Sequence, residues 1–252
     1  MTELEQLRMQ LQSLSLNHMA EIFEEEAHKA TKAKMAYTSY LARLVEEEIL
    51  VKTDRSIQAR IRKARFPSLK TLETFDFAFQ PSLDERKIKE LAQLGFISKQ
   101  ENIVFIGPPG VGKTHLAIGI GIRACQNKIR TFFTTVSSLM DQLYSTLIDH
   151  STVEMIEGFC RIPLMIIDEL GYMNMDTQRA NLFFQLISKR YEKGSTIITT
   201  NLPFERWGDV FGQDEVIASA ILDRFLHYCH IIPIQGNSYR VKDKVKPKEK
   251  LS

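Results

Sequence analysis

The sequence predicts an α/β protein in which a five-stranded parallel sheet lies between helices, preceded by a small all-α N-terminal domain. In the second half of the chain, apolar runs of strand length alternate with helical stretches. A glycine-rich loop joins the first of these runs to a helix. The first fifty residues, in contrast, contain few Gly or Pro and follow a helical period.

The N-terminal helices are predicted from apolar side chains that recur every three or four residues. The recurring positions are Leu4, Leu7, Leu11 and Leu14, and further on Tyr37, Leu41, Leu44 and Val45. Glutamates at 24–26 and 46–48 accompany them as a solvated acidic face. We therefore expect a small helical unit at the start of the chain.

A basic segment follows from Val51 to Lys70, where seven basic residues face one acid, a local charge of +6. Its stretch DRSIQARIRKARFP starts with Asp54, a good helix cap, and ends at Pro67, so it predicts a short basic helix. Clustered cations can neutralise nucleic-acid phosphates without reading the bases, although a merely solvated charged helix is the alternative. The DNA-binding candidates are Lys52, Arg55, Arg60, Arg62, Lys63 and Arg65.

The sheet is predicted from near-continuous apolar runs, which are typical of parallel strands buried on both faces. These runs are Asn102–Ile106, Arg130–Thr134, Pro163–Ile167 and Ser195–Thr199, with a possible fifth at Cys229–Ile234. We predict four segments along the chain. They are a helical DNA-binding and assembly domain at 1–66, a linker at 67–82, the α/β domain at 83–239 and a basic, disordered tail at 240–252.

The composition, 44% hydrophobic and 25% charged, is that of a folded globular protein. The net charge of +2 is a cancellation, because residues 51–70 contribute +6, residues 240–252 contribute +4 and the rest sums to −8. Near-neutrality therefore does not exclude DNA. Three widely spaced cysteines, no signal peptide and no apolar run of about 18 residues lead us to expect a cytoplasmic protein without membrane contact.

The strongest motif is GPPGVGKT at 107–114, a complete phosphate-binding loop between an apolar strand and a helix. Its members are Gly107, Pro108, Pro109, Gly110, Val111, Gly112, Lys113 and Thr114, and His115 follows as a further nucleotide-contact candidate. The glycines let backbone N–H groups converge on the β- and γ-phosphates at the positive end of the helix. Lys113 supplies a charge to these phosphates, and Thr114 is a candidate Mg²⁺ ligand. The alternative is a glycine-rich turn without nucleotide.

A second motif, LMIIDE at 164–169, is an apolar strand that ends in two carboxylates. Asp168 is the candidate metal-side residue, holding Mg²⁺ through water, and Glu169 is the candidate general base for the attacking water. An ordinary strand end is the alternative. The spacing of some fifty residues after the phosphate loop favours the functional interpretation.

Asn201 ends the next predicted strand and is a third candidate. An amide at this position can orient the attacking water or sense the γ-phosphate. The alternative is a turn-forming Asn ahead of Leu202 and Pro203. The position of Asn201 after the two preceding motifs favours the functional interpretation.

Taken in order, these motifs resemble the AAA+ superfamily, its DnaC-like helicase-loader branch and, more closely, the IstB-type helper ATPases of insertion sequences. The resemblance extends over nearly the whole chain. Beyond the phosphate loop it includes RIRKARFPSLKTLETFDF, IIDELGYMNMD, RYEKGSTIITTNLPFERWGDVFGQD and AILDRFLHYCHIIPIQGNSYR.

The resemblance implies an AAA+ P-loop core that binds ATP and Mg²⁺ and is active as a homo-oligomer, with the nucleotide between subunits. Arg224 then matches an arginine finger offered to the next subunit, although a surface arginine is the alternative. Arg240 matches the second phosphate-sensing arginine, but this chain lacks a full C-terminal lid. Phe75 and Phe77 match the region beside the adenine, and simple packing is the alternative. Ser137–Ile148 matches a helix on the inner surface of the oligomer, or is an ordinary covering helix.

Together these expectations predict an ATPase that oligomerises on duplex DNA with little sequence specificity and activates a partner transposase. A DnaC-like replicative helicase loader is the alternative, and it would prefer single strands. A metabolic P-loop kinase is a third, disfavoured by the Asp-Glu pair and by the intersubunit arginine. The six histidines show no metal spacing.

Overall fold

The computed structural model describes residues 2–241. The chain divides between Ala59 and Arg60 into two compact units. The division falls inside the long helix α3 (Tyr37–Ala64), so its last residues belong to the second unit.

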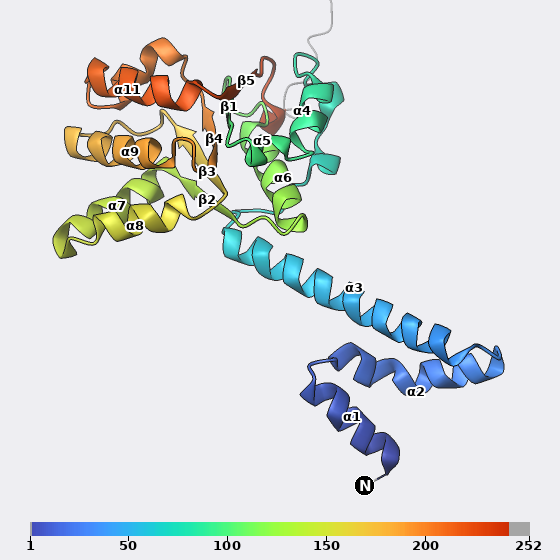
Figure 1. The fold of residues 1–252 in the computed structure, drawn as a ribbon. Helices are drawn as coiled ribbons and strands as arrows, with labels where there is room; N and C mark the ends of the chain where they lie inside the picture. Colours follow the sequence, from blue (N-terminus) through green and yellow to red (C-terminus); the bar gives the residue numbers. More distant parts are fainter. Residues whose placement is uncertain (1, 242–252) are drawn as a thin grey trace, which may run out of the picture. The chain divides into compact units, whose positions relative to one another are not determined.

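The first unit contains α1 (Glu3–Ser13), α2 (Asn17–Lys32) and the greater part of α3 (Figure 1). Met19, Phe23 and Leu44 form its small buried core. Helix α2 is stabilised at its start by the buried carboxylate of Glu48 on α3, which accepts a hydrogen bond from the backbone N–H of Met19 at 2.7 Å. The predicted helices are confirmed, although most of the apolar residues that predicted them are exposed.

The prediction of a separate short basic helix beginning at Asp54 is wrong. Helix α3 runs without a break for 28 residues, and Asp54 lies exposed in its interior. An Asp caps a helix only where its own backbone is non-helical, and no Gly or Pro interrupts the helix at this point. The helix ends at Ala64 because Arg65 adopts a left-handed φ of 61° and Pro67 follows.

The second unit is built on a five-stranded parallel sheet in the order β2-β3-β4-β1-β5. The strands are β1 (Asn102–Ile106), β2 (Thr131–Thr135), β3 (Leu164–Leu170), β4 (Ser195–Thr200) and β5 (Cys229–Pro233). All five predicted strands are therefore confirmed. The main difference is that β3 continues past Ile167 through the two carboxylates to Leu170.

Helices cover both faces of the sheet (Figure 1). One face carries α4 (Glu85–Leu91), α5 (Gly95–Ser98) and α6 (Lys113–Gln126). The other carries α7 (Val136–Asp149), α8 (Thr152–Cys160), α9 (Thr177–Arg190), α10 (Trp207–Val210) and α11 (Glu215–Leu226), with the turn η3 (Phe204–Arg206). Strand residues alternate between the two cores, Ile103 and Phe105 facing α6 and Val104 facing the opposite helices. This double burial explains the uninterrupted apolar strands.

The segment predicted as a linker packs on the second unit. It forms two short turns, η1 (Leu72–Thr74) and η2 (Phe77–Phe79), and its side chains Leu72, Phe75 and Phe77 pack against the core on the α6 side. After β5, the structure describes only the turn η4 (Tyr239–Val241), so residues 2–241 contain no helical lid. The rest of the predicted basic tail, 242–252, lies outside the described residues. Within residues 2–241, no helix is both long and apolar enough to span a membrane.

Candidate nucleotide-binding site

The predicted phosphate loop lies between β1 and the first turn of α6. Gly110 and Gly112 adopt left-handed φ values of 84° and 103°. A Cβ atom at Gly112 would lie 2.5 Å from Cε2 of Phe75, and one at Gly110 would overlap the hydroxyl of Ser238. Glycine is thus required at both positions by backbone conformation and by space.

Lys113, the first residue of α6, is buried and bends back over the loop. Its Nζ donates hydrogen bonds to the carbonyl oxygens of Gly107 at 2.6 Å and Pro108 at 2.8 Å. The pKa of Lys113 is lowered to about 8, chiefly by burial; the charge of Asp168 opposes this shift, and that of Arg240 contributes to it. A phosphate beside this ammonium would favour its charged form.

Thr114 and Asp168 are brought together at the carboxyl end of the sheet. The Thr114 hydroxyl donates to Oδ1 of Asp168 at 2.9 Å and to Oδ2 at 3.1 Å. Asp168 is 4% exposed. The two predicted metal-side residues therefore present their oxygen atoms at one point beside the start of α6.

Glu169 lies in a β-bulge. Pairing between β3 and β4 shifts after Ile167, so that Asp168 and Glu169 lie opposite the single residue Thr199. Glu169 has φ 67°, a conformation that costs a side-chain-bearing residue about 1 kcal/mol. Its side chain is exposed and lines the cavity in front of the loop.

This cavity has a volume of about 210 Å³. Its wall is formed by the loop, the ends of β3 and β4, the segment 70–80 and the turn η4. Asp76, Tyr172 and Lys70 contribute polar groups that the sequence analysis did not select. Because residues of the predicted phosphate-binding loop and acidic residues line one concave site, a nucleotide fits the lining better than an apolar ligand.

One wall of the cavity is aromatic. The ring of Phe75 lies edge-on to Phe77 at 4.8 Å and to His115 at 5.2 Å between centroids. Nε2 of His115 donates to the Thr71 carbonyl oxygen at 2.8 Å, and burial lowers the pKa of this imidazole. His115 thus joins α6 to the segment that carries the predicted adenine-side residues.

Arg240 reaches the cavity without a lid. The chain after β5 turns back over the phosphate loop, where the backbone N–H of Tyr239 donates to the Gly110 carbonyl oxygen at 2.9 Å. The amide of Gln80 donates to the Asn237 carbonyl oxygen at 3.0 Å, which fastens this segment to η2. Arg240 follows directly and lines the cavity.

Asn201 and Arg224 are placed differently from the other candidates. Asn201 follows β4 but does not line the cavity, and its buried Oδ1 has no hydrogen-bond partner among residues 2–241. Arg224 on α11 donates to the Ala220 carbonyl oxygen at 3.0 Å, and its guanidinium lies 5.0 Å from the ring centre of Phe184. It is not part of the cavity wall.

The basic candidates are divided between the two units. Lys52 and Arg55 belong to the first, where Nζ of Lys52 lies 3.6 Å from Glu48. The other four belong to the second, and the exposed ones are Arg62, Lys63 and Arg65. The guanidinium of Arg65 lies 5.5 Å from the ring centre of Phe132 on β2.

Thr199 is the residue that sequence reasoning missed. It is 1% exposed, and its hydroxyl donates to Oδ1 of Asp168 at 2.5 Å. It also accepts the backbone N–H of Glu169 at 3.0 Å. The only available signal was a polar residue near the end of an otherwise apolar strand, which is too common to single out.

Fold and site together define a P-loop nucleotide-binding protein of the AAA+ type. Among solved structures, the DnaC helicase loader matches 60% of this chain and 87% of its own, with a TM-score of 0.51 and 23% identity. DnaI matches 71% of this chain and 94% of its own, with a TM-score of 0.56 and 20% identity. At these identities the likeness concerns the fold.

Sequence comparison is more specific. The family model of the IstB-like ATP binding protein matches residues 9–247, and the chain belongs to this family. It is 43% identical to the insertion sequence IS5376 putative ATP-binding protein of Geobacillus stearothermophilus, over 94% of both chains. It is 39% identical to the insertion sequence IS21 putative ATP-binding protein of Pseudomonas aeruginosa, over 96% of this chain and 91% of the relative. The family recognised in the sequence is thereby confirmed.

Proposed function

We propose that this protein is a Mg²⁺-dependent ATPase that assembles on duplex DNA and activates a transposase of the same insertion sequence. The observation that carries the ATPase proposal is the convergence of Lys113, Thr114 and Glu169 on one cavity, with Asp168 hydrogen-bonded to Thr114. The insertion-sequence context is taken from the names of the relatives.

The donor set fits Mg²⁺. The Thr114 hydroxyl and Asp168 carboxylate are oxygen ligands, which this ion prefers. An ion held by one carboxylate, one hydroxyl and substrate phosphates is the usual form of such a Mg²⁺ site. When bound, Mg²⁺ would neutralise charge on the phosphates.

Each of the candidate site residues then has a defined role. The Lys113 ammonium exchanges its two carbonyl partners for phosphate oxygens, while backbone N–H groups at the start of α6 bind the same phosphates. Glu169 accepts the proton of the attacking water. Asn201, whose Oδ1 lacks a partner among residues 2–241, orients this water or senses the γ-phosphate. Arg240 adds a positive charge at the cavity wall.

Arg224 is proposed to act on the neighbouring subunit. It lies outside its own chain's cavity, on α11, and shares an exposed surface with Val216, which is 80% exposed. A cation delivered from a second subunit would stabilise charge in the transition state. Hydrolysis would therefore depend on assembly, with the nucleotide at the subunit interface.

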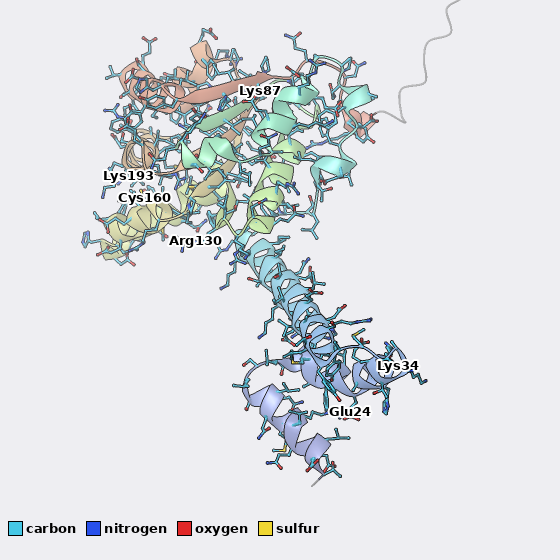
Figure 2. The ribbon with its side chains drawn as sticks, turned by 45° about the vertical axis from the view of Figure 1, so that its right-hand side comes forward. Glu24, Lys34, Lys87, Arg130, Cys160 and Lys193 are labelled. Atoms are coloured by element: carbon cyan, nitrogen blue, oxygen red, sulfur yellow. The ribbon has the colours of Figure 1, made fainter. Side chains whose placement is uncertain are left out.

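DNA contact is proposed for the exposed cations near the end of α3. Arg62, Lys63 and Arg65 are exposed, and the contact of Arg65 with Phe132 places this cluster beside β2. The loop before β2 adds exposed Lys128 and Arg130 and contains no acidic residue. Figure 2 labels Arg130. Such a surface would bind the phosphate backbone with little sequence specificity.

The scheme is tested with two variants in the presence of ATP and duplex DNA. Glu169→Gln should bind ATP and remain assembled on DNA for longer than the wild type, because only hydrolysis is lost. Lys113→Ala should lose nucleotide-driven assembly. Complex lifetimes are measured by light scattering and electron microscopy, and an unaltered lifetime of the Glu169→Gln complex would count against the scheme.

A parallel titration compares single- and double-stranded DNA at matched salt. Preference for duplex is expected. A clear preference for single strands would instead favour the helicase-loader alternative.

A further inference from the structure

Thr199 connects the two acidic residues of the site. Its side chain on β4 is buried, and its hydroxyl has two hydrogen-bond partners, Oδ1 of Asp168 at 2.5 Å and the backbone N–H of Glu169 at 3.0 Å. Both partners belong to the bulge of β3. The two residues proposed for metal binding and for proton transfer are therefore joined through one hydroxyl.

The chemistry of the partners determines the direction of both hydrogen bonds. A backbone N–H can only donate, so the Thr199 oxygen must accept from Glu169. The single hydroxyl proton is then donated to the carboxylate oxygen Oδ1 of Asp168. The hydroxyl thus accepts one hydrogen bond and donates the other.

The bulge explains why these bonds are needed. Adjacent residues of a regular strand point to opposite faces, whereas Asp168 contacts Thr114 and Glu169 lines the cavity beside it. The register shift and the left-handed φ of Glu169 bring both side chains to one edge of the sheet. They also remove the Glu169 N–H from the regular ladder, and Thr199 supplies its acceptor.

We propose that Thr199 is a positioning residue that orients the Asp168 carboxylate for Mg²⁺ and holds the Glu169 backbone in the bulge. This inference rests on the proposed ATPase function. Thr114 would also serve as a metal ligand, whereas the Thr199 hydroxyl is bonded to Asp168 and to the Glu169 backbone. Thr199 would thus hold Oδ1 of Asp168 in place for a carboxylate that helps to bind Mg²⁺.

The test measures binding of a fluorescent ATP analogue with EDTA and across a Mg²⁺ titration. Thr199→Val keeps the shape of the side chain and removes the hydroxyl. It should raise the Mg²⁺ concentration at which half of the Mg²⁺-dependent change in nucleotide affinity is reached, the Mg²⁺ half-point, by roughly tenfold or more. Removal of a hydrogen bond to a metal ligand usually has an effect of this size. Affinity in EDTA should stay within about twofold, because phosphate-loop contacts are untouched. Thr199→Ser should restore the Mg²⁺ dependence to within about threefold of the wild type.

The matched control is Thr134→Val on β2. Thr134 is also buried, but its hydroxyl donates to the Thr135 carbonyl oxygen at 3.1 Å and does not contact the acidic pair. This variant should leave the Mg²⁺ half-point unchanged. Equal effects of both valine variants on EDTA affinity and thermal unfolding, with an unchanged half-point, would mean a purely structural role and would overturn the proposal.

Two further outcomes keep the interpretation unambiguous. If Thr199→Val does not fold, Thr199→Cys replaces the hydroxyl by a weaker donor, and a half-point equal to that of the wild type would refute the role of Thr199. If the wild type itself shows no Mg²⁺ effect on nucleotide affinity, the proposed Mg²⁺-dependent function fails, and this inference with it. If nucleotide affinity of the wild type depends on Mg²⁺ and the Thr199→Val variant has the same half-point, the inference about Thr199 is overturned and the proposed function is not.

Discussion

Lys113 predicts an unusual pH dependence of nucleotide binding. In the structure its ammonium is buried against two carbonyl oxygens, and its pKa is lowered to about 8. Phosphate oxygens favour the charged form, so the pKa must be higher in the nucleotide complex. Nucleotide binding therefore takes up a proton above pH 8, and affinity falls as the pH rises.

The magnitude follows from the fraction of Lys113 that is charged before binding. With a pKa of about 8, this fraction is about nine-tenths at pH 7 and about one-tenth at pH 9. The dissociation constant of ATP in EDTA should accordingly rise about tenfold between these pH values. Calorimetry in buffers of different ionisation enthalpy should detect uptake of close to one proton at pH 9.

The control is Lys113→Arg, whose guanidinium stays charged throughout this range. Its affinity is expected to be weaker but nearly independent of pH. A wild-type affinity that is constant from pH 7 to pH 9, or a parallel fall in the arginine variant, would refute the reasoning.

Two other predictions concern stability and DNA. Arg190 is 2% exposed, and its guanidinium donates to Thr196 Oγ1 and to three carbonyl oxygens. Arg190→Met leaves these acceptors without a donor, so it should lower the free energy of unfolding by about 3 kcal/mol in urea titrations. Lys189→Met is the control, because the neighbouring Lys189 side chain is 43% exposed. A loss below about 1 kcal/mol in Arg190→Met would contradict this account. Neutralising Arg62, Lys63 and Arg65 together should weaken duplex binding and reduce the slope of log K against log[salt] by about 0.9 for each lost phosphate contact. An unchanged slope would exclude these residues as phosphate contacts.

Local sequence patterns were sufficient to predict much of the structure. The strands and the phosphate loop were predicted because burial on both faces and the need for glycine leave direct traces in the sequence. The break at Asp54 was predicted wrongly because a capping residue has the same identity inside a helix as at its start. The packing of Leu72 on the α6 side was not predicted, and that of Phe75 was given only as an alternative, because turn-rich segments look alike whether they pack or not.

The sequence by itself determined the fold class, the family and the candidate residues of the phosphate-binding loop, since these depend on chemistry at fixed spacing. Only the tertiary structure decided that Lys113 is held by carbonyl oxygens, that Arg240 reaches the cavity and that Arg224 lies away from it. It also decided that Thr199 joins Asp168 to Glu169. These facts depend on contacts between residues distant in the chain and on a bulge in strand pairing, and neither leaves a local pattern in the sequence.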